Sequence, residues 1–212
     1  MRLYTFWRSS AAYRVRIALN FKGVRYESVS RLFSRDEHRA PEYLDLNPQG
    51  LIPALDDDGF VIGQSLAIIE YLDETHREPP LLPGEPRARA VVRAMALGIA
   101  CDIHPLNNLR VLNYLKGPLA QDAAGVERWY HHWIRDGFVA LEELARRHSG
   151  DGRHLYGSAV TLADVCLVPQ LYNARRFRCD LTPFPRLTAI GAALEALPAF
   201  AAARPEAQPD AD

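Results

Sequence analysis

The chain has 212 residues, 48% of them hydrophobic and 24% charged, which is enough for one large globular domain or two smaller ones. Its 25 basic and 26 acidic residues nearly cancel, so charge gives no reason to expect binding to nucleic acid or to an anionic membrane. No apolar run approaches the roughly 18 residues of a membrane span, and the first four residues lack the layout of a signal peptide. These features favour a cytoplasmic globular protein.

The three cysteines, Cys101, Cys166 and Cys179, are odd in number and widely spaced. They lie mostly within apolar periodic segments, which predicts reduced, buried thiols and no disulfide framework. The sequence predicts no metal site either. The adjacent histidines His131 and His132 point to different faces of a predicted helix and lack further ligands.

The first eighty residues alternate between strand and helix patterns. Residues 3–6 and 26–29 predict strands. Residues 10–21 between them predict a helix that ends at Gly23, because glycine readily takes the left-handed conformation that follows many helices. Residues 34–46 are polar and irregular, with room for a short helix.

A turn and a hairpin follow. Pro53 marks a turn or the start of a strand, because proline cannot donate a hydrogen bond to a sheet, and a cis peptide bond fits that position. Residues 56–59 predict a hairpin turn and residues 60–62 the returning strand. Gln64 and Ser65 then begin a helix. This order of elements predicts a small mixed sheet with helices on its faces.

The second half of the chain is predicted to be helical. Four prolines in residues 78–86 interrupt all regular patterns, and the strand patterns disappear beyond them. Helical periodicity continues in residues 87–115, 126–147, 162–177 and 187–197. We therefore predict an α/β domain of residues 1–78, a proline-rich linker of residues 79–86 and an all-helical domain of residues 87–212.

Two local patterns in this half have structural interpretations. Thr161 and Asp164 have the spacing of a capping box, which predicts the start of a helix and no more. The tail from Ala202 is rich in alanine, proline and aspartate. It has little to bury, and we expect it to fray.

The polar stretch Arg8-Ser9-Ser10 separates the first strand from the first helix. A serine at this junction can cap the helix, and it lies beside unpaired N–H groups and the positive end of the helix dipole. That environment suits an anion, including a thiolate. From this stretch alone, a capping role is favoured over a chemical one.

The layout of an α/β domain, a proline-rich linker and a helical domain resembles that of the cytosolic glutathione transferases, and the motifs resemble their zeta class from end to end. The matching segments are residues 8–19, 47–55, 63–72, 101–112, 167–170, 174–177, 180–185 and 208–210. The resemblance implies a thioredoxin-like domain followed by a helical bundle, with glutathione as cofactor. Members of this pattern include maleylacetoacetate isomerase and maleylpyruvate isomerase.

The resemblance implies cis–trans isomerisation of a double bond conjugated to carbonyl groups. Addition of a glutathione thiolate leaves a single bond that can rotate, and loss of the thiolate restores the double bond in the trans form. Ser9 would stabilise the thiolate, Ser10 would assist or only cap the helix, and Arg8 would hold a substrate carboxylate. The usual signature is Ser-Ser-Cys-Ser, and its last two positions are here Ala11 and Ala12. No cysteine is therefore present in this motif that could take the role of Ser9.

Other matched positions imply contacts with glutathione in the α/β domain. Gln64 and Ser65 match the site of the γ-glutamyl group. Ile52, followed by Pro53, would pair its main chain with the cysteinyl part of the tripeptide, as an added strand does. Two further residues, Gln49 and His38, would reach the glycyl end, although a solvated His38 is nearly as well supported.

The helical domain would contribute four more contacts with glutathione, across the domain cleft or a dimer interface. They are Asp102, Ile103, His104 and Asn108. His104 and Asn108 are expected one turn apart on a single helix.

Arginines would bind the substrate, because a dianionic acid requires permanently charged, bidentate partners. Arg176 matches the zeta-class arginine that binds a substrate carboxylate, whereas its neighbour Arg175 is expected to be a surface charge. Arg110 resembles a position that bacterial relatives use for a second carboxylate. An exposed helix charge explains Arg110 almost equally well.

The resemblance favours conversion of maleylacetoacetate to fumarylacetoacetate in the breakdown of aromatic amino acids and aromatic acids, by a homodimer. One alternative is isomerisation of maleylpyruvate to fumarylpyruvate. Others are a general glutathione transferase acting on α-halo acids or other electrophiles, and a non-catalytic thioredoxin-like binding module. Three arginines favour an acidic substrate, and the retention of Ser9, Gln64 and Ser65 disfavours a binding module.

Overall fold

The computed structural model describes residues 1–211 and divides into two compact units. The first unit contains Met1–Leu81 together with the end of the chain from Glu195, and the second contains Leu82–Leu194. Asp212, the last residue of the predicted helical domain, lies outside the described residues.

A four-stranded mixed sheet forms the centre of the first unit. Its strands are β1 (Arg2–Thr5), β2 (Glu27–Ser30), β3 (Ala54–Asp57) and β4 (Phe60–Gly63). The order across the sheet is β2-β1-β3-β4. Strand β1 is parallel to β2 and antiparallel to β3, which is antiparallel to β4. The predicted small mixed sheet is confirmed.

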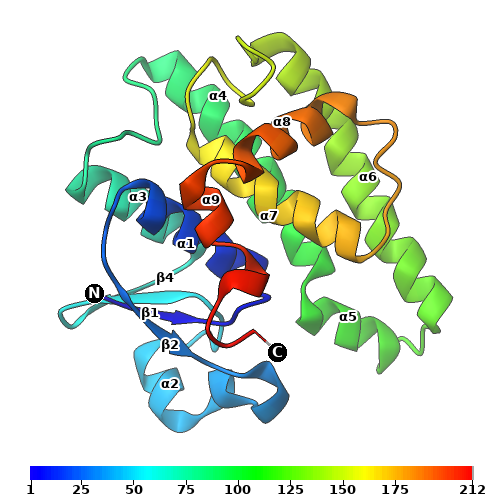
Figure 1. Ribbon diagram of the computed structural model, residues 1–212. Coiled ribbons are helices and arrows are strands. Elements are labelled where there is room, and N and C mark those ends of the chain that lie inside the picture. Colours follow the sequence, from blue (N-terminus) through cyan, green and yellow to red (C-terminus); the bar gives the residue numbers. More distant parts are fainter. Residues whose placement is uncertain (212) are drawn as a thin grey trace. The chain divides into compact units, whose positions relative to one another are not determined.

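Three helices accompany the sheet: α1 (Ser10–Phe21), α2 (Pro41–Leu46) and α3 (Ser65–Thr75). Figure 1 shows α1 and α3 on one side of the sheet and α2 on the other. Helix α1 ends as predicted, with Gly23 in the left-handed region at φ 64°. Two short 3-10 turns, Phe33–Arg35 and Glu37–Arg39, precede α2.

The chain returns to this unit at its end. Helix α9 (Pro198–Ala202) packs against α1, and a 3-10 turn, Pro205–Ala207, follows. Figure 1 shows this last segment in red beside the blue start of the chain. The expectation that the tail frays is wrong, because Ala203 and Pro205 are buried.

The start of the proline-rich segment is fixed to the first unit by a buried lysine. Lys22 Nζ donates to Asp73 Oδ1 at 2.7 Å and to the carbonyl oxygens of His76 and Pro79 at 2.8 and 2.9 Å. Asp73 also accepts a hydrogen bond from the Leu81 N–H at 2.7 Å. A buried ammonium needs this number of oxygen partners to offset its lost hydration.

The second unit is helical: α4 (Pro86–Leu97), α5 (Leu109–Lys116), α6 (Ala123–His148), α7 (Leu162–Arg176) and α8 (Pro185–Glu195). Helix α4 packs against α7. The predicted capping box is present at the start of α7, where Thr161 and Asp164 exchange hydrogen bonds. Among the described helices, none combines the length and apolar character needed to cross a bilayer.

The helical periodicity of residues 87–115 corresponds to two α-helices with an interruption between them. Helix α4 gives way to a π-helical turn, Gly98–Ile103, and a 3-10 turn, His104–Asn107, before α5 begins. Pro105 has no N–H to donate and its ring opposes a preceding carbonyl, so an α-helix cannot pass through it undisturbed. Asn108 is extended (φ −69°, ψ 147°) and caps α5.

The cysteines form no disulfide within the described residues. Cys166 is buried and Cys179 is half-buried, but Cys101 is exposed. The prediction of burial is therefore wrong for Cys101, which lies two residues from both buried Ile99 and buried Ile103 and so faces the opposite side of the turn.

Candidate functional site

Ser9 lies where sequence reasoning placed it, at the N-terminus of α1. Its side-chain oxygen accepts the Ala12 N–H at 3.2 Å, so Ser9 is the N-cap residue. Capping uses only the oxygen as acceptor, and the hydroxyl hydrogen is still available for donation. Ser9 is half-exposed, whereas Ser10 is buried. Ser9 therefore combines a helix cap with a hydroxyl that a bound anion can reach.

Arg8 lies beside Ser9 and is exposed. Its guanidinium carbon is 4.9 Å from the centre of the Trp7 indole ring and 5.9 Å from the Phe6 ring. Contact with aromatic faces holds the side chain near the loop through a cation–π attraction. A permanent positive charge and a hydroxyl are thus adjacent at one helix N-terminus.

The segment before β3 lies next to this junction. Ile52 belongs to the same buried cluster as Ala12, the residue capped by Ser9, and Phe6 packs against that cluster. The Ile52–Pro53 peptide bond is cis. Among the described residues, no hydrogen bond uses the N–H or the carbonyl of Ile52. Both groups are available to an extended peptide.

Two predicted glutathione residues meet at the start of α3. Gln64 Nε2 donates to Gln49 Oε1 at 2.8 Å, and both side chains are exposed. Gln64 has a left-handed backbone conformation, with φ 66°. Such a conformation is costly for glutamine and is maintained only where the surroundings demand it. Ser65 is buried, and its hydroxyl accepts a hydrogen bond from Arg14 at 3.4 Å.

His38 lies near the same segment, but it is buried, so the alternative of a solvated His38 is wrong. The imidazole packs against Phe33 with the two rings tilted by 32° and their centres 4.3 Å apart. Burial, assisted by the charge of Arg39, lowers the pKa of His38, so the ring is neutral at pH 7. Its Nδ1 is buried and has no hydrogen-bond partner in the described protein. A buried polar atom of this kind is suited to a ligand or a water.

In the second unit, Arg176 ends α7 and is exposed. Its guanidinium carbon lies 4.8 Å from the centre of the Phe177 ring. Phe177 is fixed by α6, because its ring stacks on Tyr130 at 3.8 Å and its carbonyl accepts a hydrogen bond from His131 at 2.8 Å. Sequence reasoning missed these supporting residues, because they lie on a different helix from Arg176.

The region of residues 102–110 differs from the expected single helix. Asp102 and Arg110 are exposed, and His104 and Asn108 are half-exposed. Since Asn108 caps α5 and His104 belongs to a 3-10 turn, the two are not one turn apart on an α-helix. Ile103 is buried, and its side chain occupies the space that a Cβ at Gly137 would need. A ligand contact at Ile103 would therefore use its main chain.

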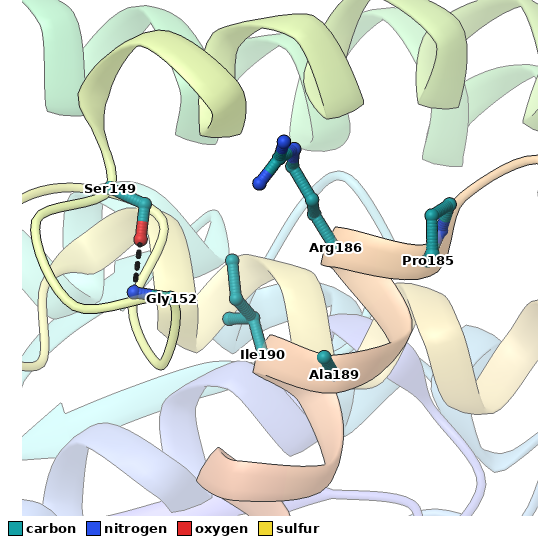
Figure 2. Close-up of a pocket in the computed structure, with 6 residues that line it drawn as sticks. All are labelled: Ser149, Gly152, Pro185, Arg186, Ala189 and Ile190. Carbon is teal, nitrogen blue, oxygen red and sulfur yellow. Dashed lines mark hydrogen bonds between the residues drawn. The ribbon is translucent and has the colours of Figure 1, made fainter.

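A separate surface hollow of about 350 Å³ lies between α8 and the turn after α6. Figure 2 shows Arg186 projecting beside it and Ser149 accepting a hydrogen bond from Gly152. The hollow involves no residue predicted for glutathione or substrate. Within residues 1–211, no group of three or more histidine, cysteine or acidic side chains is placed to hold a metal ion.

Comparisons with known proteins agree with these features. Residues 8–75 match the family described as the N-terminal domain of glutathione S-transferase. The chain is a glutathione transferase by fold and by sequence. It is 53% identical to a probable maleylacetoacetate isomerase of Vibrio cholerae over 99% of this chain and 97% of that protein. The chain belongs to the zeta-class family of maleylacetoacetate and maleylpyruvate isomerases.

Two solved structures extend the comparison to ligands. A bacterial zeta-class maleylpyruvate isomerase, solved in its holo form, has a TM-score of 0.97 and 47% identity over the whole of both chains. The isomerase of Anaeromyxobacter dehalogenans has a TM-score of 0.86 and 41% identity, covering 100% of this chain and 97% of its own. That isomerase holds dicarboxyethyl glutathione and citrate in its active site.

Proposed function

We propose that this chain is a glutathione-dependent cis–trans isomerase that converts maleylacetoacetate to fumarylacetoacetate. The observation that carries the proposal is the Ser9 hydroxyl, which caps α1 with its oxygen and leaves its hydrogen to donate. Membership of a family of isomerases supports the reaction type. The dicarboxyethyl glutathione held by one relative supports sulfur addition to an unsaturated diacid.

The first unit has groups that fit glutathione. The main-chain N–H and carbonyl of Ile52 match the needs of an extended peptide, and the N-terminus of α3 at Gln64 and Ser65 suits a carboxylate. The buried, unpartnered Nδ1 of His38 and the exposed amide of Gln49 are further polar partners. From the second unit, Asp102, Ile103, His104 and Asn108 complete the proposed glutathione set.

Bound glutathione would supply the nucleophile, a thiolate that adds to the double bond and leaves after rotation. Ser9 would donate its hydroxyl hydrogen to the sulfur, and the start of α1 would add the positive end of its dipole. Together these lower the pKa of a thiol placed there. Ser10, which is buried, would act through its main chain or only support the helix.

Arginines would bind the acid. Arg8 would stabilise negative charge that develops on the substrate oxygen, because it stands next to the thiolate position. Arg176 would bind one carboxylate with both of its terminal nitrogens. Exposed Arg110 would bind the other.

We expect Arg176→Lys to raise the KM for the diacid by about tenfold or more, because lysine keeps the charge but loses the two-point contact. The KM for glutathione should stay within about twofold of wild type. Steady-state kinetics with each substrate varied in turn measures both constants. The matched control is Arg175→Lys, at an exposed neighbour on the same helix. Equal effects of the two substitutions would contradict the assigned role of Arg176.

Isomerisation is tested directly by following the absorbance of the conjugated acid with and without glutathione. Turnover of maleylacetoacetate that requires glutathione is the expected result. Failure to isomerise this acid or maleylpyruvate, combined with turnover of model halides, would overturn the proposal in favour of a general transferase.

Maleylpyruvate is the second candidate substrate, and the TM-score of 0.97 with a maleylpyruvate isomerase is the observation that favours it. The ratio of kcat/KM for the two acids decides between them. A homodimeric, cytoplasmic enzyme is also part of this proposal, supported by the family resemblance. Light scattering of the purified chain tests the dimer.

A further inference from the structure

The loop that carries the proposed thiolate residue, here called the β1–α1 loop (Phe6–Ser9), is short and has few bonds of its own. It begins after β1 and ends at the cap of α1, and one main-chain hydrogen bond closes it, from the Ser9 N–H to the Phe6 carbonyl at 3.0 Å. Any rotation at Trp7 would move Arg8 and Ser9 together. The groups that fix Trp7 therefore determine where these two side chains point.

Both main-chain groups of Trp7 are held by charged side chains. The Trp7 N–H donates to Asp210 Oδ2 at 3.1 Å, across 203 residues of chain. The Trp7 carbonyl accepts a hydrogen bond from Arg16 Nη2 at 2.9 Å. Hydrogen bonds with one charged partner are roughly twice as strong as neutral ones. The N–H of Trp7 is thus bound by a carboxylate and its carbonyl by a guanidinium.

Asp210 is itself anchored to the sheet. The same oxygen, Oδ2, accepts the Ser30 hydroxyl at 2.7 Å, and Ser30 is the partner of Thr5 in the pairing of β2 with β1. The residues before it are also ordered, since Gln208 donates to the carbonyls of Ala202 and Arg204 at 3.0 and 2.8 Å. Asp210 therefore presents its carboxylate from a fixed position.

Arg16 links the same loop to the same end of the chain. It is fully buried, and its Nε donates to the Ala203 carbonyl at 3.1 Å. Its Nη1 donates to Thr5 Oγ1 at 3.1 Å and to the Phe6 carbonyl at 3.3 Å. The C-terminal tail, residues 203–211, thus meets the loop through Arg16 at one end and through Asp210 at the other.

We propose that Asp210 is a positioning residue, which holds Trp7 so that Arg8 and Ser9 face the thiolate and the substrate. The link from Trp7 to Arg8 is direct, because the guanidinium of Arg8 rests on the indole ring. The proposal rests on the proposed function for its chemical consequence. Its structural part, that the tail restrains the loop, does not depend on that function.

The test compares Asp210→Ala, Asp210→Asn and wild type in the full-length chain. The alanine variant leaves the Trp7 N–H without its acceptor, so amide hydrogen exchange at residues 7–9 should become about tenfold faster. We expect kcat to fall about tenfold and the pKa of the bound glutathione thiol to rise. The asparagine variant keeps an oxygen that can accept the N–H, and should retain kcat within about threefold.

The matched control is Asp151→Ala in the second unit. Asp151 also accepts one main-chain N–H, from Arg153 at 2.8 Å, and one side-chain donor, His154 at 2.9 Å. This variant should leave kcat, the thiol pKa and exchange in the loop unchanged. A thermal denaturation curve for each variant shows that the chain is folded at the assay temperature.

The outcomes separate the two claims. Unchanged exchange at residues 7–9 in Asp210→Ala would overturn the restraint by the tail, and faster exchange with unchanged kcat and thiol pKa would overturn the positioning role. A wild-type chain that binds no glutathione would refute the proposed function and with it the positioning role. The exchange measurement would still show whether the tail restrains the loop.

Discussion

Replacing Ser9 by alanine is expected to lower kcat about a hundredfold, because the variant loses the hydroxyl that would stabilise the thiolate of glutathione. The same substitution removes the acceptor for the Ala12 N–H and should cost about 1 kcal/mol of stability. Steady-state kinetics at saturating glutathione measures the first effect. A denaturant titration measures the second.

A second substitution separates capping from chemistry. In Ser9→Asp the carboxylate still caps α1, since aspartate is a good N-cap residue, but it cannot donate to sulfur and it repels a thiolate. The aspartate variant should therefore keep the wild-type free energy of unfolding and be at least as inactive as the alanine variant. If Ser9→Asp retains wild-type turnover, Ser9 is only a cap.

Replacing Asp164 by alanine should lower the free energy of unfolding by about 3–5 kcal/mol, more than any other substitution proposed here. Asp164 is fully buried and accepts three hydrogen bonds, from the Leu155 N–H at 2.7 Å and from the Thr161 N–H and hydroxyl at 2.8 Å. Alanine leaves two main-chain N–H groups without acceptors. Because a domain is stable by only about 5–15 kcal/mol, this loss is a large fraction of the total, and a denaturant titration should show a clearly lower midpoint for the variant.

The control for this substitution is Asp122→Ala, which removes a carboxylate from the start of α6. Asp122 is exposed and accepts the Gly125 N–H at 2.6 Å. Water can replace that bond, so the loss should be about 1 kcal/mol. Similar losses for the two variants would contradict the view that burial makes the Asp164 network essential.

Because Asp164 is buried, the free energy of unfolding of the chain also depends on pH. Desolvation raises the pKa of Asp164 to about 6 in the folded chain, above its ordinary value of 3.8. The folded state then binds this proton more tightly than the unfolded state does. The part of the free energy of unfolding that comes from the bound proton is therefore complete below pH 3.8 and is lost as the pH rises to about 6. The difference between wild type and Asp164→Ala should decrease over this window in denaturant titrations. A constant difference would contradict the raised pKa.

The sheet and its first helix were predictable because their patterns are local. Alternation in short apolar runs marks the strands, and Gly23 marks the end of α1 through its own conformational freedom. Ser9 and Arg8 lie at a junction that such patterns define. The helical character of the second half was predictable for the same reason.

Features that depend on contacts between distant residues were not predictable. The order of the tail arises from Asp210 meeting Trp7 and Ser30, and nothing near Asp210 in the sequence signals this. The burial of His38 likewise depends on a contact with the Phe33 ring in an irregular segment. Pro105 was a usable signal for the interruption before α5, but helical periodicity on both sides of it concealed the break.

The proposed catalysis depends above all on the ionisation of glutathione beside Ser9. The thiolate absorbs ultraviolet light and the thiol does not, so a pH titration of the complex measures the pKa of the bound sulfur. A free thiol has a pKa of about 8.5, and we predict that binding to the wild-type chain lowers it by roughly one to two units and binding to Ser9→Ala does not. If glutathione bound to the wild-type chain has the same thiol pKa as free glutathione, Ser9 does not stabilise a thiolate.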